Sequence, residues 1–173
     1  MSRLRPGRPR LLALAVAVFA VVPSASAAAR ASADSRAAAV AQYREAVRCL
    51  LNAQRAQAGL APLAPNRRLA RAARRFSQAM VRQRFFDHVS PQGSTMDRRV
   101  RAAGYADPMV GETIAWGAGA LATPAAIVQG WMNSPPHRAI IMDGRFHEVG
   151  LGIAAGSPAG DSDATTVTAD FGG

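Results

Sequence analysis

The first part of the chain repeats apolar residues at helical spacing. From Arg36 onward, side chains that recur once per turn fall on one stripe: Val40, Tyr43, Val47, Leu50 and Leu51. Gly59 is a typical end for such a helix. A second side carries only small residues: Ala46, Cys49, Ala53 and Ala56. The pattern predicts a helix from Arg36 to about Gly59 that is buried on two sides, with Cys49 as a packed residue rather than a reactive thiol.

A second helix is predicted from Asn66, which is a good N-cap residue. One face of this segment carries Leu69, Ala73, Phe76 and Met80, and the opposite face carries Arg67, Arg71, Arg74, Arg75 and Arg82. We interpret the arginines as a solvated face rather than a nucleic-acid or lipid surface, because no aromatic residues lie among them for base stacking.

Two shorter helices follow. Ser94 or Thr95 begins the first, which ends at Gly104. Thr123 and Pro124 supply a cap and a first-turn proline for the next. That helix places its apolar residues inward, Trp131 among them, and ends in the turn "NSPPHR".

The pattern then becomes that of strands. The segments "EVGLGIAA" and "TTVTADFG" combine β-branched residues, alternation and glycine. The earlier "GETIAWG" is a third strand or an irregular segment. Helices come first and strands later, without regular βαβ alternation, so we predict an α+β fold with helices packed on a mainly antiparallel sheet.

The beginning of the chain has the composition of a secretory signal peptide. A basic stretch, the apolar run "LLALAVAVFAVV" and a small-residue cleavage zone predict a leader over residues 1–27. The apolar run is shorter than the roughly 20 residues needed to cross a bilayer, although an uncleaved anchor is the alternative. Residues 28–35 read as a flexible lead-in and 36–173 as one domain. We expect a monomer that is secreted or held in the cell envelope, with no transmembrane segment after cleavage.

The charge balance narrows the expected partners. The formal net charge is +10, and all the basic residues are arginine. This excess favours anionic wall polymers or lipid headgroups as partners, although a biased genome composition explains the absence of lysine as well. No nucleic-acid partner is expected. Cys49 is the single cysteine, which excludes an intramolecular disulfide.

Three short segments contain the polar groups best suited to chemistry. His88 lies in "FFDHVSPQG", Glu112 in "GETIAWG" and His137 in "NSPPHR". Each lies at the end of an element or in a turn, with bulky apolar neighbours that would form the walls of a pocket. Taken singly, each residue is more typical of an ordinary surface position than of a functional site.

The order and setting of these segments resemble the CAP superfamily in its bacterial form. These are secreted SCP-like domains related to cysteine-rich secretory proteins and plant pathogenesis-related proteins. The resemblance covers about Arg44 to Gly172 and rests on these motifs: "LLNAQRAQAGLAPL", "NRRLARAARRFSQAM", "FFDHVSPQG", "RRVRAAGY", "GETIAWG", "WMNSPPHRAIIMDGRFHEVGLG" and "DFG".

The resemblance implies a three-layer α-β-α sandwich with a central cleft lined by two histidines and one or two acids. His88 and His137 match the two histidines, and Glu112 matches the acid of the family's G-E-N segment. Thr113 stands where the family usually has Asn. Ser134 stands at the second acid of many eukaryotic members, so their four-residue catalytic set is not implied here.

The chemistry of these residue types agrees with a cleft for a divalent cation or a small polar ligand. Two neutral imidazoles can bind Zn²⁺, and a nearby carboxylate can ligate the ion or hold a metal-bound water. We therefore predict a cleft of His88, Glu112, Ser134 and His137, with the two histidines as metal ligands.

Two other functions stay open. One is a metal-assisted hydrolase with Glu112 as general base, although the chain has no H-E-x-x-H motif or other catalytic motif beyond the cleft. The other is a sterol or fatty-acid carrier with a separate groove. We expect Ser134 to act as a local helix cap rather than as a nucleophile. Trp116 and Trp131 are expected in the core, and His147 at the surface.

Overall fold

The computed structural model describes residues 25–173 of the chain. Its helices are α1 (Ala25–Gln57), α2 (Arg67–Gln83), α3 (Met96–Ala102), α4 (Pro124–Asn133) and α5 (Pro135–Ile141), with a 3-10 turn η1 (Gly119–Ala122) before α4. Its strands are β1 (Ala64–Pro65), β2 (Val110–Ala118), β3 (Glu148–Ala155) and β4 (Ala164–Gly172). The predicted leader falls mainly on residues 1–24, which lie outside this description.

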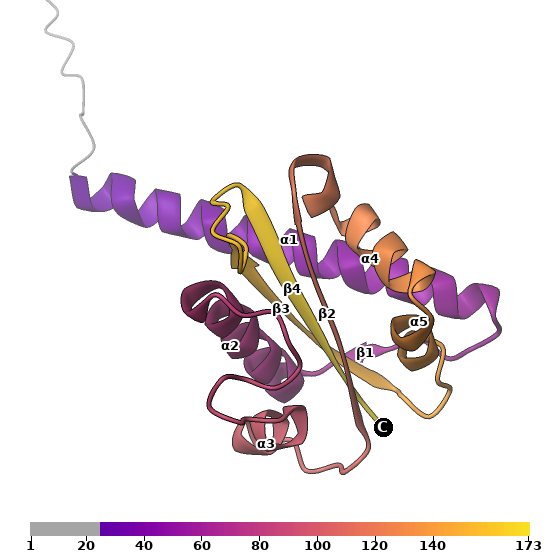
Figure 1. The fold of residues 1–173 in the computed structure, drawn as a ribbon. Helices are drawn as coiled ribbons and strands as arrows, with labels where there is room; N and C mark the ends of the chain where they lie inside the picture. Colours follow the sequence, from indigo (N-terminus) through magenta and orange to yellow (C-terminus); the bar gives the residue numbers. More distant parts are fainter. Residues whose placement is uncertain (1–24) are drawn as a thin grey trace, which may run out of the picture.

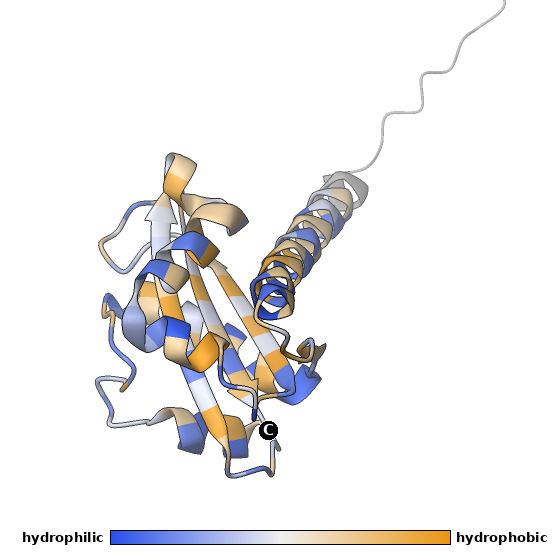
Figure 2. Cartoon of the chain, turned by 90° about the vertical axis from the view of Figure 1, so that its right-hand side faces the viewer, coloured by the Kyte–Doolittle hydropathy of each residue, from blue (hydrophilic) through white to orange (hydrophobic). Residues whose placement is uncertain are grey.

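The elements form three layers, as predicted. The sheet has the order β1-β3-β4-β2, with α1, α4 and α5 on one face and α2 and α3 on the other (Figure 1). The larger core lies on the α1 side, where Leu51, Trp131 and Phe171 are each at most 1% exposed. A smaller core joins Phe76 and Met80 of α2 to Ile114 of β2. Figure 2 shows hydrophobic segments running along the strands between these helical layers.

The sheet is mixed rather than purely antiparallel. β2 and β3 each pair antiparallel with β4, whereas the two-residue strand β1 pairs parallel with the start of β3. The segment "GETIAWG", which the sequence left between strand and irregular structure, is the middle of β2. Because β4 has a neighbour on both sides, its residues are the most enclosed of the sheet.

Helix α2 lies directly on β3. A Cβ added to Gly150 would lie 2.0 Å from the backbone nitrogen of Ala70, and one added to Gly152 would lie 2.1 Å from the carbonyl carbon of Ala73. The two glycines therefore allow the helix backbone to touch the strand. The predicted cap is present, since Asn66 Oδ1 accepts hydrogen bonds from the backbone N–H groups of Arg68 and Leu69 at 2.8 and 3.1 Å.

One arginine joins the end of α1 to the segment between α5 and β3. Arg55 is 0% exposed, and its guanidinium donates to the carbonyl oxygens of Ala61, Ile141, Asp143 and Phe146 at 2.7–2.9 Å. A buried cation with this many charge-assisted hydrogen bonds fixes the surrounding loops. No sequence pattern indicated this role, because Arg55 follows the apolar stripe without an acidic partner nearby.

Helix α1 differs from its prediction in two ways. It begins at Ala25 rather than Arg36, so residues 28–35 are helical, and residues 29–39 are exposed on all sides where the helix extends beyond the sheet (Figure 1). Its small-residue side is not buried either. Cys49 is exposed, and its Sγ lies 3.2 Å from Glu45 Oε1, so the expected packed cysteine is wrong.

The two tryptophans have different environments. Trp131 is 1% exposed and donates its indole N–H to the carbonyl oxygen of Ile114 at 3.0 Å, which confirms its place in the core. Trp116 is 39% exposed, so its expected core position is wrong. It lies on β2, which is an edge strand, so no further strand lies beside it to cover its side chain. His147 is exposed, as predicted.

Candidate functional site

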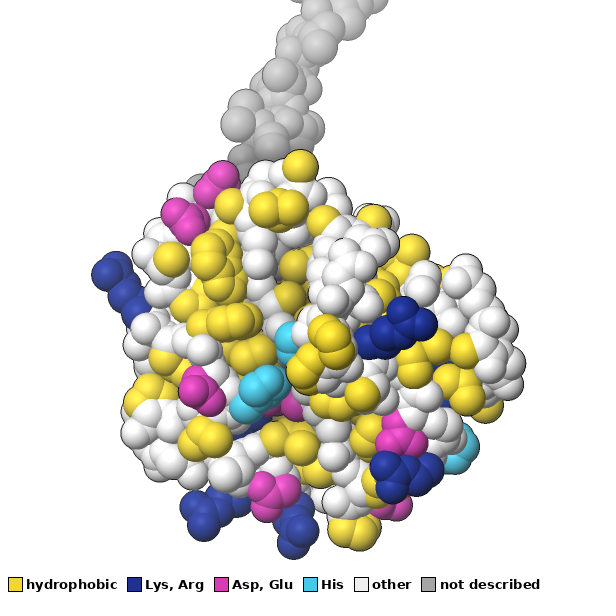
Figure 3. Space-filling model, turned by 45° about the vertical axis from the view of Figure 1, so that its right-hand side comes forward, with side chains coloured by type: hydrophobic (Ala, Val, Ile, Leu, Met, Phe, Trp, Pro, Cys, Tyr) yellow, Lys and Arg dark blue, Asp and Glu magenta, His cyan; other side chains and the backbone are white. Residues whose placement is uncertain are grey.

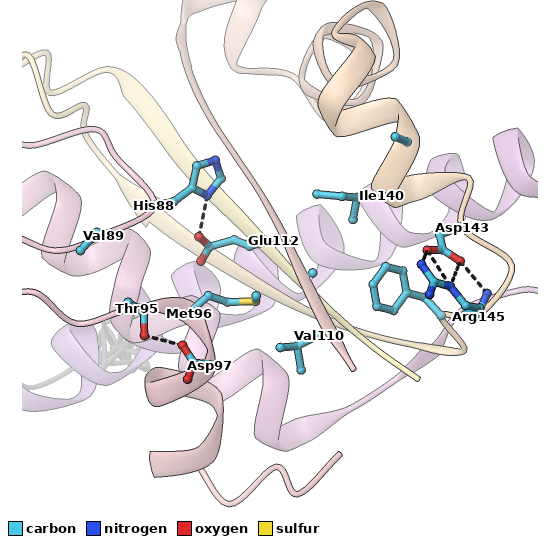
Figure 4. Close-up of a pocket in the computed structure, with 13 residues that line it drawn as sticks. His88, Val89, Thr95, Met96, Asp97, Val110, Glu112, Ile140, Asp143 and Arg145 are labelled. Carbon is cyan, nitrogen blue, oxygen red and sulfur yellow. Dashed lines mark hydrogen bonds and ion pairs between the residues drawn. The ribbon is translucent and has the colours of Figure 1, made fainter. Parts of the chain in front are cut away.

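A pocket of about 630 Å³ opens beside the edge strand β2. It lies between the loop that follows α2, the start of α3, and the segment from α5 to Phe146 (Figure 4). Its lining combines polar and apolar side chains: His88, Val89, Thr95, Met96, Asp97, Val110, Glu112, Ile140, Asp143, Arg145 and Phe146, with Gly111 and Ala139. Figure 3 looks onto this side of the molecule, where histidine and acidic side chains adjoin one another among hydrophobic groups.

Glu112 is the centre of the polar part of this pocket. It is 4% exposed, although it lies on an edge strand. Its Oε1 is 2.8 Å from His88 Nδ1, and its Oε2 is 2.6 Å from Arg99 Nη2. Both carboxylate oxygens therefore have charge-assisted or polar partners, which a buried carboxylate requires.

Arg99 was not identified by the sequence analysis, yet it holds the site together. From α3 it packs over the ring of Phe76, with its guanidinium carbon 3.3 Å from the ring centroid. The same guanidinium donates to the carbonyl oxygens of His88 and Ser94 at 3.0 and 2.8 Å. Arg99 thus fixes both the carboxylate of Glu112 and the backbone of the loop that carries His88.

His88 projects from the loop toward Glu112 (Figure 4). Because a carboxylate only accepts hydrogen bonds, the geometry places a proton on Nδ1 and leaves Nε2 for a ligand. The hydrogen bond to Glu112 raises the pKa of His88 above its ordinary value, an effect that burial partly opposes. The side chain is 50% exposed, so it is open to a ligand from solvent.

His137 lies on α5, across from His88 and beside the pocket rather than in its lining. The ring centroids of His88 and His137 are 6.3 Å apart. Burial, and then the charge of His88, lower the pKa of His137 below its ordinary value. The expected turn "NSPPHR" is in fact a helix start, because Pro135 and Pro136 occupy the first positions of α5, where a missing N–H is harmless.

Ser134 lies at the N-cap position of α5, in the short joint between α4 and α5. Its carbonyl oxygen accepts from the backbone N–H of Arg138 at 2.9 Å, but its hydroxyl makes no capping hydrogen bond. The structure places it at the end of the helix that carries His137, outside the residues that line the pocket. The sequence-based grouping of Ser134 with His88 and Glu112 is thus not reproduced in the lining of this pocket.

A second buried carboxyl group lies directly behind Glu112. Asp170 of β4 pairs in register with Glu112 of β2 and is 0% exposed. Neither of its carboxylate oxygens has a hydrogen-bond donor. Burial, followed by the charge of Glu112, raises the pKa of Asp170 well above its ordinary value, although Arg99 acts in the opposite direction. The motif "DFG" contained this residue, but only strand pairing brings it to the site.

Similarity to known sequences decides the family. The family model described as "CAP: Cysteine-rich secretory protein family" matches residues 38–171. The chain belongs to the CAP family. A curated relative, "Uncharacterized protein YkwD" of Bacillus subtilis (strain 168), is 38% identical over 120 residues, which cover 68% of this chain and 45% of that protein. The chain therefore spans less than half the length of this relative.

Two solved structures share the fold. An "extracellular protein containing a SCP domain from Bacillus anthracis" has a TM-score of 0.63 at 27% identity, over 73% of this chain and 38% of the other. An outer surface protein from Borrelia burgdorferi has a TM-score of 0.66 at 17% identity, over 76% of this chain and 92% of the other. The second likeness shows the fold alone.

The CAP residues that depart from the family pattern have a clear place in the structure. Thr113 replaces the usual Asn after the acid, and it is 0% exposed with its hydroxyl oxygen unpartnered. Its neighbour in the strand pairing is Ala169, which has no polar side chain to offer.

Along residues 25–173, no helix combines the length and the apolar character needed to cross a membrane.

Proposed function

We propose that this CAP domain acts outside the cytoplasm and binds a divalent cation, with Zn²⁺ as the best candidate, through His88 and His137. The export part rests on the leader pattern of residues 1–27 and on the similarity to a Bacillus anthracis protein described as extracellular. The cation part rests on the contact between His88 Nδ1 and Glu112 Oε1, 2.8 Å apart.

That contact is the arrangement by which proteins orient histidine ligands. A ligating histidine usually donates its other N–H to a carboxylate, which fixes the ring and makes the free nitrogen a stronger ligand. Glu112 accepts the hydrogen bond from Nδ1, so His88 offers Nε2 to a cation. The lowered pKa of His137 keeps that second ring neutral and able to bind metal near neutral pH.

The donor set fits a loosely held cation. Zn–N distances of roughly 2.0–2.1 Å bring two ligating imidazole centroids to about 5 Å for a tetrahedral angle, whereas these centroids are 6.3 Å apart. The two rings would have to approach each other by about 1 Å while His88 keeps its contact with Glu112. Among the residues described, no group of at least three His, Cys, Asp or Glu side chains is placed to hold a metal. The remaining coordination positions would belong to water or a small polar ligand.

Glu112 is better suited to orient His88 than to act as a general base. Its two oxygens are engaged by His88 and Arg99, so a water molecule would have to displace one of them. The hydrolase alternative would need that displacement and has no further supporting contact. The lipid-carrier alternative predicts binding that does not depend on either histidine.

Calorimetry with ZnCl₂ tests the proposal. We expect binding at pH 7.5 that weakens at least ten-fold at pH 5, because protons compete for the imidazoles. His88→Ala combined with His137→Ala should remove the binding, whereas His147→Ala, which changes an exposed histidine outside the pocket, should leave it unchanged. Binding that survives the double substitution, or no binding at all, would reject the cation site.

A further inference from the structure

Four arginines from two helices surround a second, shallower cavity. Arg44 of α1 and Arg67, Arg71 and Arg74 of α2 line about 240 Å³ together with Ala70. This cavity shares no residue with the pocket of His88 and Glu112. An adjoining hollow of about 220 Å³ adds Arg48, Asn66 and the acidic Glu45 to the same region.

The fold builds this cluster in two steps. Arg67, Arg71 and Arg74 follow helical spacing, so they share one face of α2. β1 pairs with only Glu148 and Val149 of β3, so the edge of the sheet beyond that point has no strand neighbour. Residues of both α1 and α2 line the two cavities at this edge. Arg44 of α1 therefore lies beside the arginines of α2. The sequence predicted an ordinary solvated face here, because it did not place α1 beside α2.

The cluster has no acidic partner within the described part of the chain. None of its four guanidinium groups forms an ion pair there. Glu45, the acid beside Arg44 in sequence, is held by Arg48 at 2.5 Å. Arg44 Nε is buried without any hydrogen-bond acceptor. Burial, and then the charge of Arg74, lower the pKa of Arg44. Several positive charges therefore lie close together, and the Nε–H group of Arg44 is a hydrogen-bond donor without an acceptor.

We propose that Arg44, Arg67, Arg71 and Arg74 form a binding site for a ligand with closely spaced phosphate groups. Guanidinium groups match phosphate oxygens with paired hydrogen bonds, and several of them around a small volume suit a dense polyanion. Arg67 is the first residue of α2, so the positive end of the helix dipole adds to the charge there. No aromatic side chain lines the cavity, so the site offers no platform for stacked bases.

Calorimetry with sodium tripolyphosphate at low ionic strength tests this site, with phosphatidylglycerol vesicles as a second probe for phosphate carried on a lipid. We expect Arg71→Gln to weaken binding several-fold and Arg44→Gln with Arg71→Gln at least ten-fold. Arg82→Gln is the matched control, because it removes the same charge from α2 outside the cavity. It should change affinity less than two-fold. Arg71 is exposed, so its single substitution reports on the site without disturbing the core.

The two probes separate the source of the phosphate. Binding of tripolyphosphate with this dependence supports a free polyphosphate-like ligand, and binding of vesicles alone with the same dependence supports a lipid headgroup. Equal weakening by Arg82→Gln would show that only net charge matters, and it would overturn the proposal. Failure of both probes to bind would overturn it as well.

Discussion

Glu112 and Asp170 face each other across the ladder of β2 and β4, two buried carboxyl groups at one register position. Glu112 has His88 and Arg99 as partners, whereas both oxygens of Asp170 are without a donor. Two neighbouring carboxylates cannot both ionise cheaply in a buried place, so the charge belongs to the one with partners. The site therefore has a carboxyl group with two partners in front, and behind it a carboxyl group whose burial favours the neutral form.

Asp170→Asn should stabilise the protein at neutral pH by more than about 1.4 kcal/mol, the linkage value of one pKa unit, because the unfolded carboxyl ionises there and burial opposes ionisation of the folded one. The pKa of Asp170 is raised in the folded state, so folding favours its protonated form. Its stabilising effect is present below about pH 4 and is lost as the pH rises toward the folded pKa. Urea unfolding of wild type and variant should thus coincide near pH 4 and diverge above it. Asp163→Asn, at an exposed position, should show no such divergence.

Arg99 and Glu112 should depend strongly on each other. Their side chains are 10% and 2% exposed, so removing one leaves the other buried without its partner. We expect Arg99→Met to lower the free energy of unfolding by about 3 kcal/mol. Arg99→Met with Glu112→Gln should lose less than the sum of the two single changes. The neighbouring exposed Arg98→Met should cost under about 0.5 kcal/mol. Additive effects in this double-mutant cycle would contradict the assigned ion pair.

The contact of α2 with β3 predicts opposite effects for two glycine-to-alanine changes. Gly150→Ala places a methyl group 2.0 Å from the backbone of Ala70, and backbone cannot move aside as a side chain can. We expect loss of stability large enough to reduce the folded yield. Gly130→Ala, inside α4 with open space around it, should instead stabilise by about 0.5–1 kcal/mol. Thermal unfolding distinguishes the two, and a harmless Gly150→Ala would contradict this packing.

Most helices and strands could be predicted from the sequence because caps and apolar periods are local signals. Asn66, Thr123 and the glycine-rich strands carry such signals in a few residues. The errors come from non-local contacts. Cys49 and Trp116 were misplaced because the sequence does not say which helix side lacks a partner or which strand is the edge.

The residues of the candidate site also fall into two groups, those that short sequence motifs indicate and those that only the fold brings together. His88, Glu112 and His137 were predicted from the resemblance of their short motifs to the CAP family, because none of the three is distinctive when taken singly. Asp170 was missed because strand register alone places it behind Glu112. Arg99 was missed because the chain has 21 basic residues, all arginine, and nothing local separates this one from the solvated arginines.

The pH dependence of Zn²⁺ binding should show what Glu112 does for His88. The pKa of His88 is raised mainly by its hydrogen bond to Glu112, so protons compete with the cation at higher pH than at an ordinary histidine. In the wild-type protein, the affinity for Zn²⁺ should therefore continue to increase as the pH is raised beyond about 6.5. Glu112→Gln removes the carboxylate charge, so the midpoint of this rise should move to lower pH.

The same substitution should also weaken binding at the alkaline end of the profile. Loss of an orienting carboxylate typically lowers metal affinity about 10- to 100-fold. Calorimetry from pH 5.5 to 8 then measures two separate effects, a lower midpoint and a lower plateau. Asp97→Asn, at an exposed acid of the same pocket, is the matched control and should leave both close to wild type. If Glu112→Gln lowers the plateau without moving the midpoint, Glu112 does not set the protonation of His88, and the cation would have to contact the carboxylate itself.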